Sequence, residues 1–268
     1  TKCVLLDSTA DFLLRQNSAT FFYGNARINS SSTYNPVTGV TNTLGQLGNF
    51  FCGDFSFHAW VKFTNDDAIE PIWSMSTSAN VGIRFIKDGS NNLILRLDST
   101  DISGGTDVAH NTWHNVIVTY SPTTKDALVY LNGNGTPEAS NTNITWDGDK
   151  NMGYSYIGTD LAQSSDDNDH MFGNVFEVAY WNKALTAAEV ALVYNGGDPV
   201  NLADTFGLQA PLKWSQMGDF DLDSASGIYD TIRFGDTANQ QFSMGGISSP
   251  VNGIFGSNVT IVTDSPSS

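Results

Sequence analysis

The chain has 268 residues, with 12 Lys and Arg against 28 Asp and Glu, so its formal net charge is −16. Such a charge repels phosphates, so we expect no nucleic acid binding. No run of residues approaches the ~18 apolar residues of a membrane span, so we expect no membrane insertion. Hydrophobic residues make up 40% and aromatic residues 12% of the chain, which excludes the composition of a disordered protein. The length fits one large domain, or one domain with appendages.

The first 52 residues contain both cysteines and a long polar segment. Cys3 and Cys52 could form a disulfide or remain two buried thiols, and nothing in the sequence indicates an oxidising compartment. Residues 17–50 are rich in Asn, Ser and Thr and show little periodicity, so we interpret them as a long insertion or an arm.

Alternation of apolar and polar residues is the dominant pattern after residue 54, and it predicts strands. The alternating segments, separated by turn-forming residues, are 55–63, 81–87, 93–97, 113–120, 127–131, 154–158 and 174–181. Many short strands with almost no helical periodicity predict an all-β protein, an antiparallel β-sandwich or jelly roll.

One short helix is predicted after the last of these strands. Thr186 and Glu189 have the spacing of a capping box, and Val190 and Val193 begin an apolar stripe. Gly196 and Gly197 then end the helix. About ten residues are too few for a stable isolated helix, so it has to pack on the sandwich.

Weaker strand-like segments follow Pro199. They lie at 208–214, 220–222, 228–234, 242–244 and 259–262. We predict that residues 1–198 form the sandwich and that the strands of 199–268 pack on that same sandwich.

The order of several motifs resembles a known family. The motifs are DSTADFL at 7–13, FSFHAWVK at 55–62, WHNVIVTY at 113–120, LVYLNG at 128–133, YIGT at 156–159 and FGNVFEVAYWNKALT at 172–186. Together they resemble laminin-G-like domains of the concanavalin A-like lectin/glucanase superfamily. This resemblance implies a concanavalin A-like antiparallel β-sandwich (jelly roll) with one short helix after the last core strand.

The C-terminal part is similar to a narrower group, the virion-associated lectin-like proteins of marine bacteriophages. The similar segments are LKWSQMGD at 212–219, IYD at 228–230 and VTDSP at 262–266, although Ser215 replaces the usual arginine. The resemblance implies a structural or adhesion protein on the virion surface, at the capsid, neck or tail. Its expected partners are other virion proteins, copies of itself, and host-surface or environmental glycans.

The sequence favours a protein that is not an enzyme. Glucanases of the superfamily carry a Glu-x-Asp-x-Glu strand, whose alternation places the acids on one face for acid and nucleophile roles. The nearest segment here contains Asp219, Asp221 and Asp223, which is the wrong composition. Two alternatives stay open: a polysaccharide-degrading enzyme of the same fold, and a bacterial surface adhesin module.

Acidic clusters provide candidate sites for a structural Ca²⁺, which prefers oxygen ligands. Asp219, Asp221, Asp223 and Asp230 have the spacing of positions 1, 3, 5 and 12 of an EF-hand-like loop, but Ser224 stands where glycine is expected. The other candidates are Asp166, Asp167 and Asp169 in one loop and Glu177, which occupies an acidic strand position of the resembled family. A solvated strand face and a solvated turn are the alternatives for the two clusters.

Glycan binding requires an exposed aromatic face with polar groups beside it. Trp146, with Asp147 and Asp149, is the first candidate and Trp73 the second, although burial of Trp146 against the sandwich rim is an open alternative. Trp60, Trp113 and Trp181 are assigned to the core.

Overall fold

The structure is a computed structural model of the whole chain. It describes residues 3–6, 14–17, 53–64, 69–78, 81–105, 107–146, 154–158, 171–211, 213–215, 229–231, 233–234, 241–243 and 260–262.

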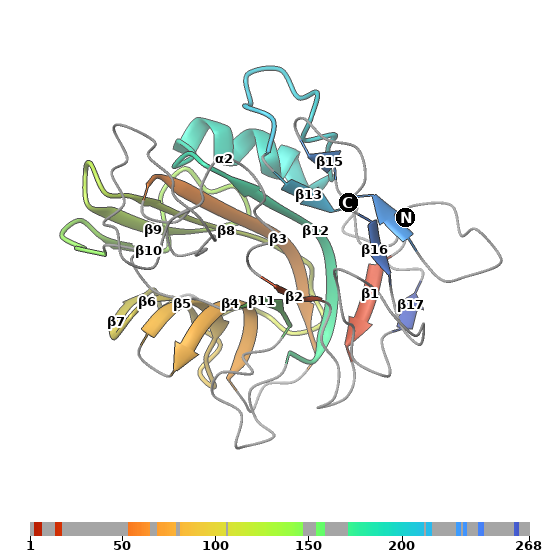
Figure 1. Cartoon of the computed structure of the whole chain (residues 1–268), viewed down its shortest axis with the longest axis horizontal. Coiled ribbons are helices and arrows are strands. Elements are labelled where there is room, and N and C mark those ends of the chain that lie inside the picture. The colour runs from red at the N-terminus through yellow and green to blue at the C-terminus, as the bar shows by residue number, and fades with distance from the viewer. Residues whose placement is uncertain are drawn as a thin grey trace.

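Two antiparallel sheets form the described part of the chain, and they lie as two layers (Figure 1). The larger sheet has nine strands in the path β10 (Ala139–Asn141), β9 (Asp126–Leu131), β8 (His114–Ser121), β3 (Phe55–Phe63), β12 (Gly173–Trp181), β1 (Cys3–Leu6) and β17 (Thr260–Val262), with β13 (Lys213–Ser215) beside β12 and β15 (Arg233–Phe234) beside β13. The smaller sheet has six strands in the order β2 (Leu14–Asn17), β11 (Tyr154–Ile157), β4 (Glu70–Ser78), β5 (Val81–Lys87), β6 (Leu93–Leu97) and β7 (Thr100–Ser103). A separate pair is formed by β14 (Tyr229–Thr231) and β16 (Gln241–Ser243).

The main core lies between the two large sheets, because each strand contributes alternate residues to it. In β3, Phe57, Ala59 and Val61 belong to this core, whereas His58 and Trp60 fall on the outer face of the sheet. The all-β sandwich predicted from the alternation is confirmed.

Helix α2 (Ala187–Tyr194) covers the outer face of the larger sheet (Figure 1). The predicted capping box is present: the Thr186 hydroxyl accepts from the Glu189 amide, and the Glu189 carboxylate accepts from the Thr186 amide. The left-handed cap is Asn195 rather than the predicted glycines, and a 3₁₀ turn, η2 (Asn195–Gly197), follows. Val190, Val193 and Leu202 bury a second apolar cluster against this face.

Several strands were absent from the sequence prediction. Strand β4 begins at Glu70-Pro71, and its alternation is interrupted at a register shift where the adjacent residues Ile72 and Trp73 both enter the core. Strands β7 and β10 are short. After the helix, predicted segments contain β14, β15 and β17 and overlap β13 and β16, whereas 220–222 lies outside the described residues. No helix in the described ranges is long and apolar enough to cross a membrane.

Candidate carbohydrate-binding face

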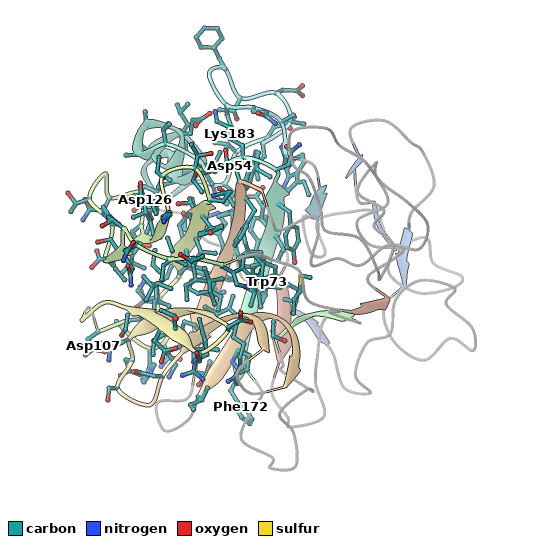
Figure 2. All side chains as sticks on the ribbon, turned by 60° about the vertical axis from the view of Figure 1, so that its left-hand side comes forward. Asp54, Trp73, Asp107, Asp126, Phe172 and Lys183 are labelled. Atoms are coloured by element: carbon teal, nitrogen blue, oxygen red, sulfur yellow. The ribbon has the colours of Figure 1, made fainter. Side chains whose placement is uncertain are left out.

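The two tryptophans predicted to contact sugar are buried in the core. Trp146 is 3% exposed, and its ring packs edge-on against Phe55 and Tyr120 with centroid distances of 5.8 and 5.9 Å. Trp73 is 0% exposed and stacks on Phe57 at 4.8 Å; Figure 2 shows it in the interior. The prediction of exposed platforms at Trp146 and Trp73 is therefore wrong, because neighbouring aromatic rings cover both. Asp147 and Asp149 lie outside the described residues.

Trp113 is the one tryptophan of the six with a partly exposed side chain; the other five are buried. We assigned it to the core because it falls at a hydrophobic position of the resembled family. In the structure it lies on the outer face of the larger sheet with Trp60, Phe176 and Tyr194, a set that we call the outer aromatic cluster. Trp60 and Phe176 are buried, and Trp113 and Tyr194 are the half-exposed members.

Local backbone geometry holds Tyr194 in this cluster. Its ring stacks on Trp60, with 5.8 Å between centroids and 30° between planes. A Cβ placed on Gly133 would come within 2.4 Å of the Tyr194 Cβ, and Gly133 has φ +65°. The turn that follows β9 can therefore contact the last turn of α2 only because residue 133 has no side chain.

Lys62 supplies a cationic group beside the exposed aromatic surface. Its ammonium lies 5.5 Å from the centroid of the Trp113 ring, within cation–π range. Asn174 stands opposite Lys62 in the pairing of β12 with β3. This end of the outer face thus combines a half-exposed indole, a half-exposed phenol and an ammonium group, the chemistry that can stack on a sugar ring and donate to its oxygens.

A buried acidic residue lies beneath this face. Glu177 is the extra residue of a β-bulge, where the pairing of β12 with β3 shifts between Phe176 and Val178, and its φ is +51°. As a result Val175 and Val178 both enter the core. The bulge directs the Glu177 carboxyl to the outer face of the larger sheet. There it accepts a hydrogen bond of 2.9 Å from the Trp214 indole N–H of β13.

Burial raises the pKa of Glu177 to about 8, against the opposing effect of the Trp214 and Trp60 indole N–H groups. The carboxyl is therefore predominantly protonated at neutral pH. In the structure this carboxyl has an indole N–H as its hydrogen-bond partner, and the prediction that Glu177 binds a metal ion stays a prediction.

A second buried polar pair, His58 of β3 and Asn115 of β8, lies in the same sheet. Asn115 Nδ2 is 2.9 Å from His58 Nε2, whereas His58 Nδ1 and Asn115 Oδ1 have no hydrogen-bond partner. Burial lowers the pKa of His58 to about 3, so its imidazole is neutral at physiological pH. Neither residue reaches the surface, and we assign both a structural role.

The structure describes one of the remaining calcium candidates. Asp230 lies in β14, where it pairs with Phe242 of β16. The others, Asp166, Asp167, Asp169, Asp219, Asp221 and Asp223, lie outside the described residues. Within the described part, no group of three or more His, Cys, Asp or Glu side chains could hold a metal ion.

Two antiparallel sheets packed face to face, with a helix and an aromatic cluster on the outer face, define a lectin-like β-sandwich. More specifically, the chain belongs to the family described as the concanavalin A-like lectin/glucanases superfamily, whose model matches residues 18–191. The match begins inside segment 17–50, which we interpreted as an insertion or arm. No curated protein matches the chain.

Solved structures with carbohydrate-related names share the fold. A putative carbohydrate binding protein from Bacteroides ovatus is 15% identical, with a TM-score of 0.56; the match covers 99% of this chain and 61% of that protein. The CBM40 domain of the Ruminococcus gnavus IT-sialidase, in complex with α2,3-sialyllactose, is 9% identical with a TM-score of 0.50, covering 72% and 98%. This chain thus spans less than two thirds of the Bacteroides protein.

Proposed function

We propose that this chain is a non-catalytic carbohydrate-binding protein of a bacteriophage particle, displayed on the virion surface. The observation that carries the binding function is the exposure of Trp113. It is the one tryptophan that reaches the surface, and it lies beside the Lys62 ammonium and the Tyr194 ring.

The chemistry of the outer aromatic cluster suits a saccharide. The C–H faces of a pyranose stack on an indole, and Lys62 and the Tyr194 hydroxyl can donate to sugar oxygens. The patch is small, so each contact is expected to be weak, and many copies on one particle would provide avidity. The carbohydrate-binding neighbours of the same fold support this function.

The experiment is a glycan array probed with multimeric protein, with and without Ca²⁺. Trp113→Ala is expected to lower the signal at least tenfold, and Trp113→Phe to retain part of it because an aromatic face remains. Phe206→Ala is the matched control, since it removes an exposed aromatic side chain outside the outer aromatic cluster. Absence of binding by the multimeric wild-type protein, or equal binding by Trp113→Ala, would refute this site.

The virion role is supported by the similarity of 212–219, 228–230 and 262–266 to marine phage virion proteins. It predicts that the protein is found by mass spectrometry in purified virions. Its detection in a bacterial envelope fraction alone would favour the adhesin alternative.

Lack of activity is tested separately. Incubation with marine polysaccharides is expected to release no reducing ends. Release that is lost in Asp219→Asn or Asp221→Asn would establish the hydrolase alternative and overturn the non-catalytic assignment.

A further inference from the structure

A buried lysine and a buried glutamate face each other in the smaller sheet. Lys87 is the last residue of β5 and Glu70 the first of β4, and the two stand opposite each other in the pairing of these strands. Lys87 Nζ is 3.6 Å from Glu70 Oε1, and both side chains are fully buried. Two buried charges are costly to desolvate, so a reaction that removes both of them is favoured.

Asn91, in the turn between β5 and β6, brings a carbonyl group to the same ammonium. Lys87 Nζ donates to Asn91 Oδ1 at 3.2 Å and to the Asp88 carbonyl at 3.5 Å. Because a carbonyl bond is about 1.2 Å long, Nζ is no farther than about 4.4 Å from Asn91 Cγ. The nitrogen of one side chain and the electrophilic carbon of the other are therefore neighbours in the folded chain.

His110 provides a second donor to the same oxygen. A lysine can only donate, which identifies the atom that it contacts as the oxygen of the Asn91 amide. His110 Nε2 lies 3.0 Å from this oxygen and therefore carries the hydrogen between them. Two donors on one carbonyl oxygen stabilise the negative charge that develops there when a nucleophile adds to the carbon.

Backbone hydrogen bonds hold Asn91 in this position. Its amide donates to the Asp88 carbonyl at 3.0 Å, and its carbonyl accepts from the Val108 amide at 2.9 Å. Its φ of +63° lies in the left-handed region that asparagine tolerates. The Asn92 amide, which would attack Cγ in a deamidation, donates instead to the Asp88 carboxylate at 2.8 Å. The fold thus presents Asn91 Cγ to Lys87.

We propose that Lys87 and Asn91 join through an amide bond between their side chains. Glu70 Oε1 takes a proton from the Lys87 ammonium, and the resulting amine adds to Asn91 Cγ. A second proton passes from Nζ through the Glu70 carboxyl to Asn91 Nδ2. The Cγ–Nδ2 bond then breaks, ammonia leaves, and a neutral amide remains beside a protonated Glu70. The chain itself supplies every reactant.

Burial supports this reaction. Solvent does not reach Lys87 or Glu70, and the Phe63 ring, with its centroid 5.5 Å from Nζ, forms an apolar wall beside the amine. A neutral amide and a neutral acid replace the buried ion pair, which lowers the desolvation cost. Asn91 and His110 are partly exposed, so ammonia can leave. Only the folded chain brings the groups together, and newly folded protein therefore still contains the ion pair.

Peptide mapping of the full chain, incubated for one week and then unfolded and digested with trypsin, tests the proposal. Trypsin cuts after Lys and Arg, so an unreacted chain is cut after Arg84, Lys87 and Arg96. The amide blocks cleavage after Lys87, and the expected product is the intact peptide 85–96, lighter by one ammonia molecule. Cleavage after Lys125 is the internal control, because this exposed lysine also precedes an aspartate.

Three variants test the roles of the side chains, with tryptophan fluorescence to verify that each is folded. Lys87→Arg keeps the charge but lacks the amine, and Asn91→Gly suits the left-handed φ but lacks the side-chain carbonyl, so each is expected to abolish the product. Glu70→Gln removes the proton acceptor and is expected to lower the yield at least tenfold.

Complete cleavage after Lys87 in the incubated wild type, at unchanged mass, refutes the proposal. Loss of ammonia with Lys87 still cleaved also refutes it, because that result indicates a succinimide. Deamidation of Asn91 without the amide, or a product that persists in Lys87→Arg, is equally contrary. An unchanged yield in Glu70→Gln excludes Glu70 as the proton acceptor.

Discussion

Replacing Glu177 with glutamine should change how the stability of the protein depends on pH. The pKa of this carboxyl is about 8 in the folded chain and 4.5 as the reference for the unfolded chain. Its folded-state pKa is raised, so the stability it contributes is fully present below pH 4.5 and is lost as the pH rises to about 8. At 1.36 kcal/mol per pKa unit, the loss is on the order of 5 kcal/mol between pH 4 and pH 9.

Glutamine keeps an oxygen for the Trp214 indole but cannot ionise. It adds a side-chain N–H₂ beside the Trp60 indole N–H, a pH-independent cost of about 1 kcal/mol. Below pH 4.5, wild type is therefore expected to be slightly more stable than Glu177→Gln, and at pH 9 the variant is expected to be more stable by several kcal/mol.

Urea unfolding followed by tryptophan fluorescence, at half-unit steps from pH 4 to 9, measures this difference in the free energy of unfolding. The quantity to compare is the slope of this difference with pH, because the slope does not depend on the pH-independent cost of the glutamine side chain. Asp107→Asn, which removes one exposed carboxylate, is the control for the change in net charge. A flat difference for Glu177→Gln would show that the carboxyl is not buried as described.

Three further predictions concern other buried groups. His58→Gln should flatten the acid limb of the same titration, because the lowered pKa of His58 makes stability fall as the pH drops from 6.5 to about 3. Since the Glu177 contribution falls above pH 4.5, wild type should be most stable between pH 4.5 and 6.5. A wild-type maximum above pH 8 would argue against the Glu177 assignment, and an acid limb that is equally steep in His58→Gln would argue against the His58 assignment. Lys87→Met should lower the free energy of unfolding in urea by about 3–5 kcal/mol, because it leaves the Glu70 carboxylate buried without its ammonium partner. Lys87 Nζ is 3.6 Å from Glu70 Oε1, and both side chains are fully buried. The double variant with Glu70→Leu should recover most of this loss. Gly133→Ala should displace Tyr194, lowering the free energy of unfolding by about 1–3 kcal/mol and weakening glycan binding in the same preparation.

Local signals in the sequence predicted the regular elements well. The Thr186–Glu189 capping box depends on residues three positions apart, and the structure has both of its hydrogen bonds. The alternation of 55–63 likewise gives the bounds of β3, because one of its faces enters the core. Strand β4 carries a weaker signal, since a register shift brings the adjacent residues Ile72 and Trp73 both into the core and breaks its alternation.

Exposure of the tryptophans could not be predicted in this way. Trp113 and Trp146 are both flanked by polar residues, yet one is half-exposed and the other is buried. What separates them is which rings lie across from each, and those rings come from distant parts of the chain. The one available clue for Trp113 is its spacing from Asn115. Residues two positions apart lie on the same face of a strand, and Asn115 is polar.

The sequence by itself determined the sandwich class, the start of the helix and the acidic character, because each depends on periodicity, short-range capping or composition. Only the tertiary structure decided the surroundings of Glu177 and Phe206. A bulge directs Glu177 toward an indole donor 37 positions later in the chain, and burial there raises the pKa of its carboxyl. A turn against α2 leaves Phe206 in solvent, and no local pattern indicates which phenylalanine the packing of distant segments leaves uncovered.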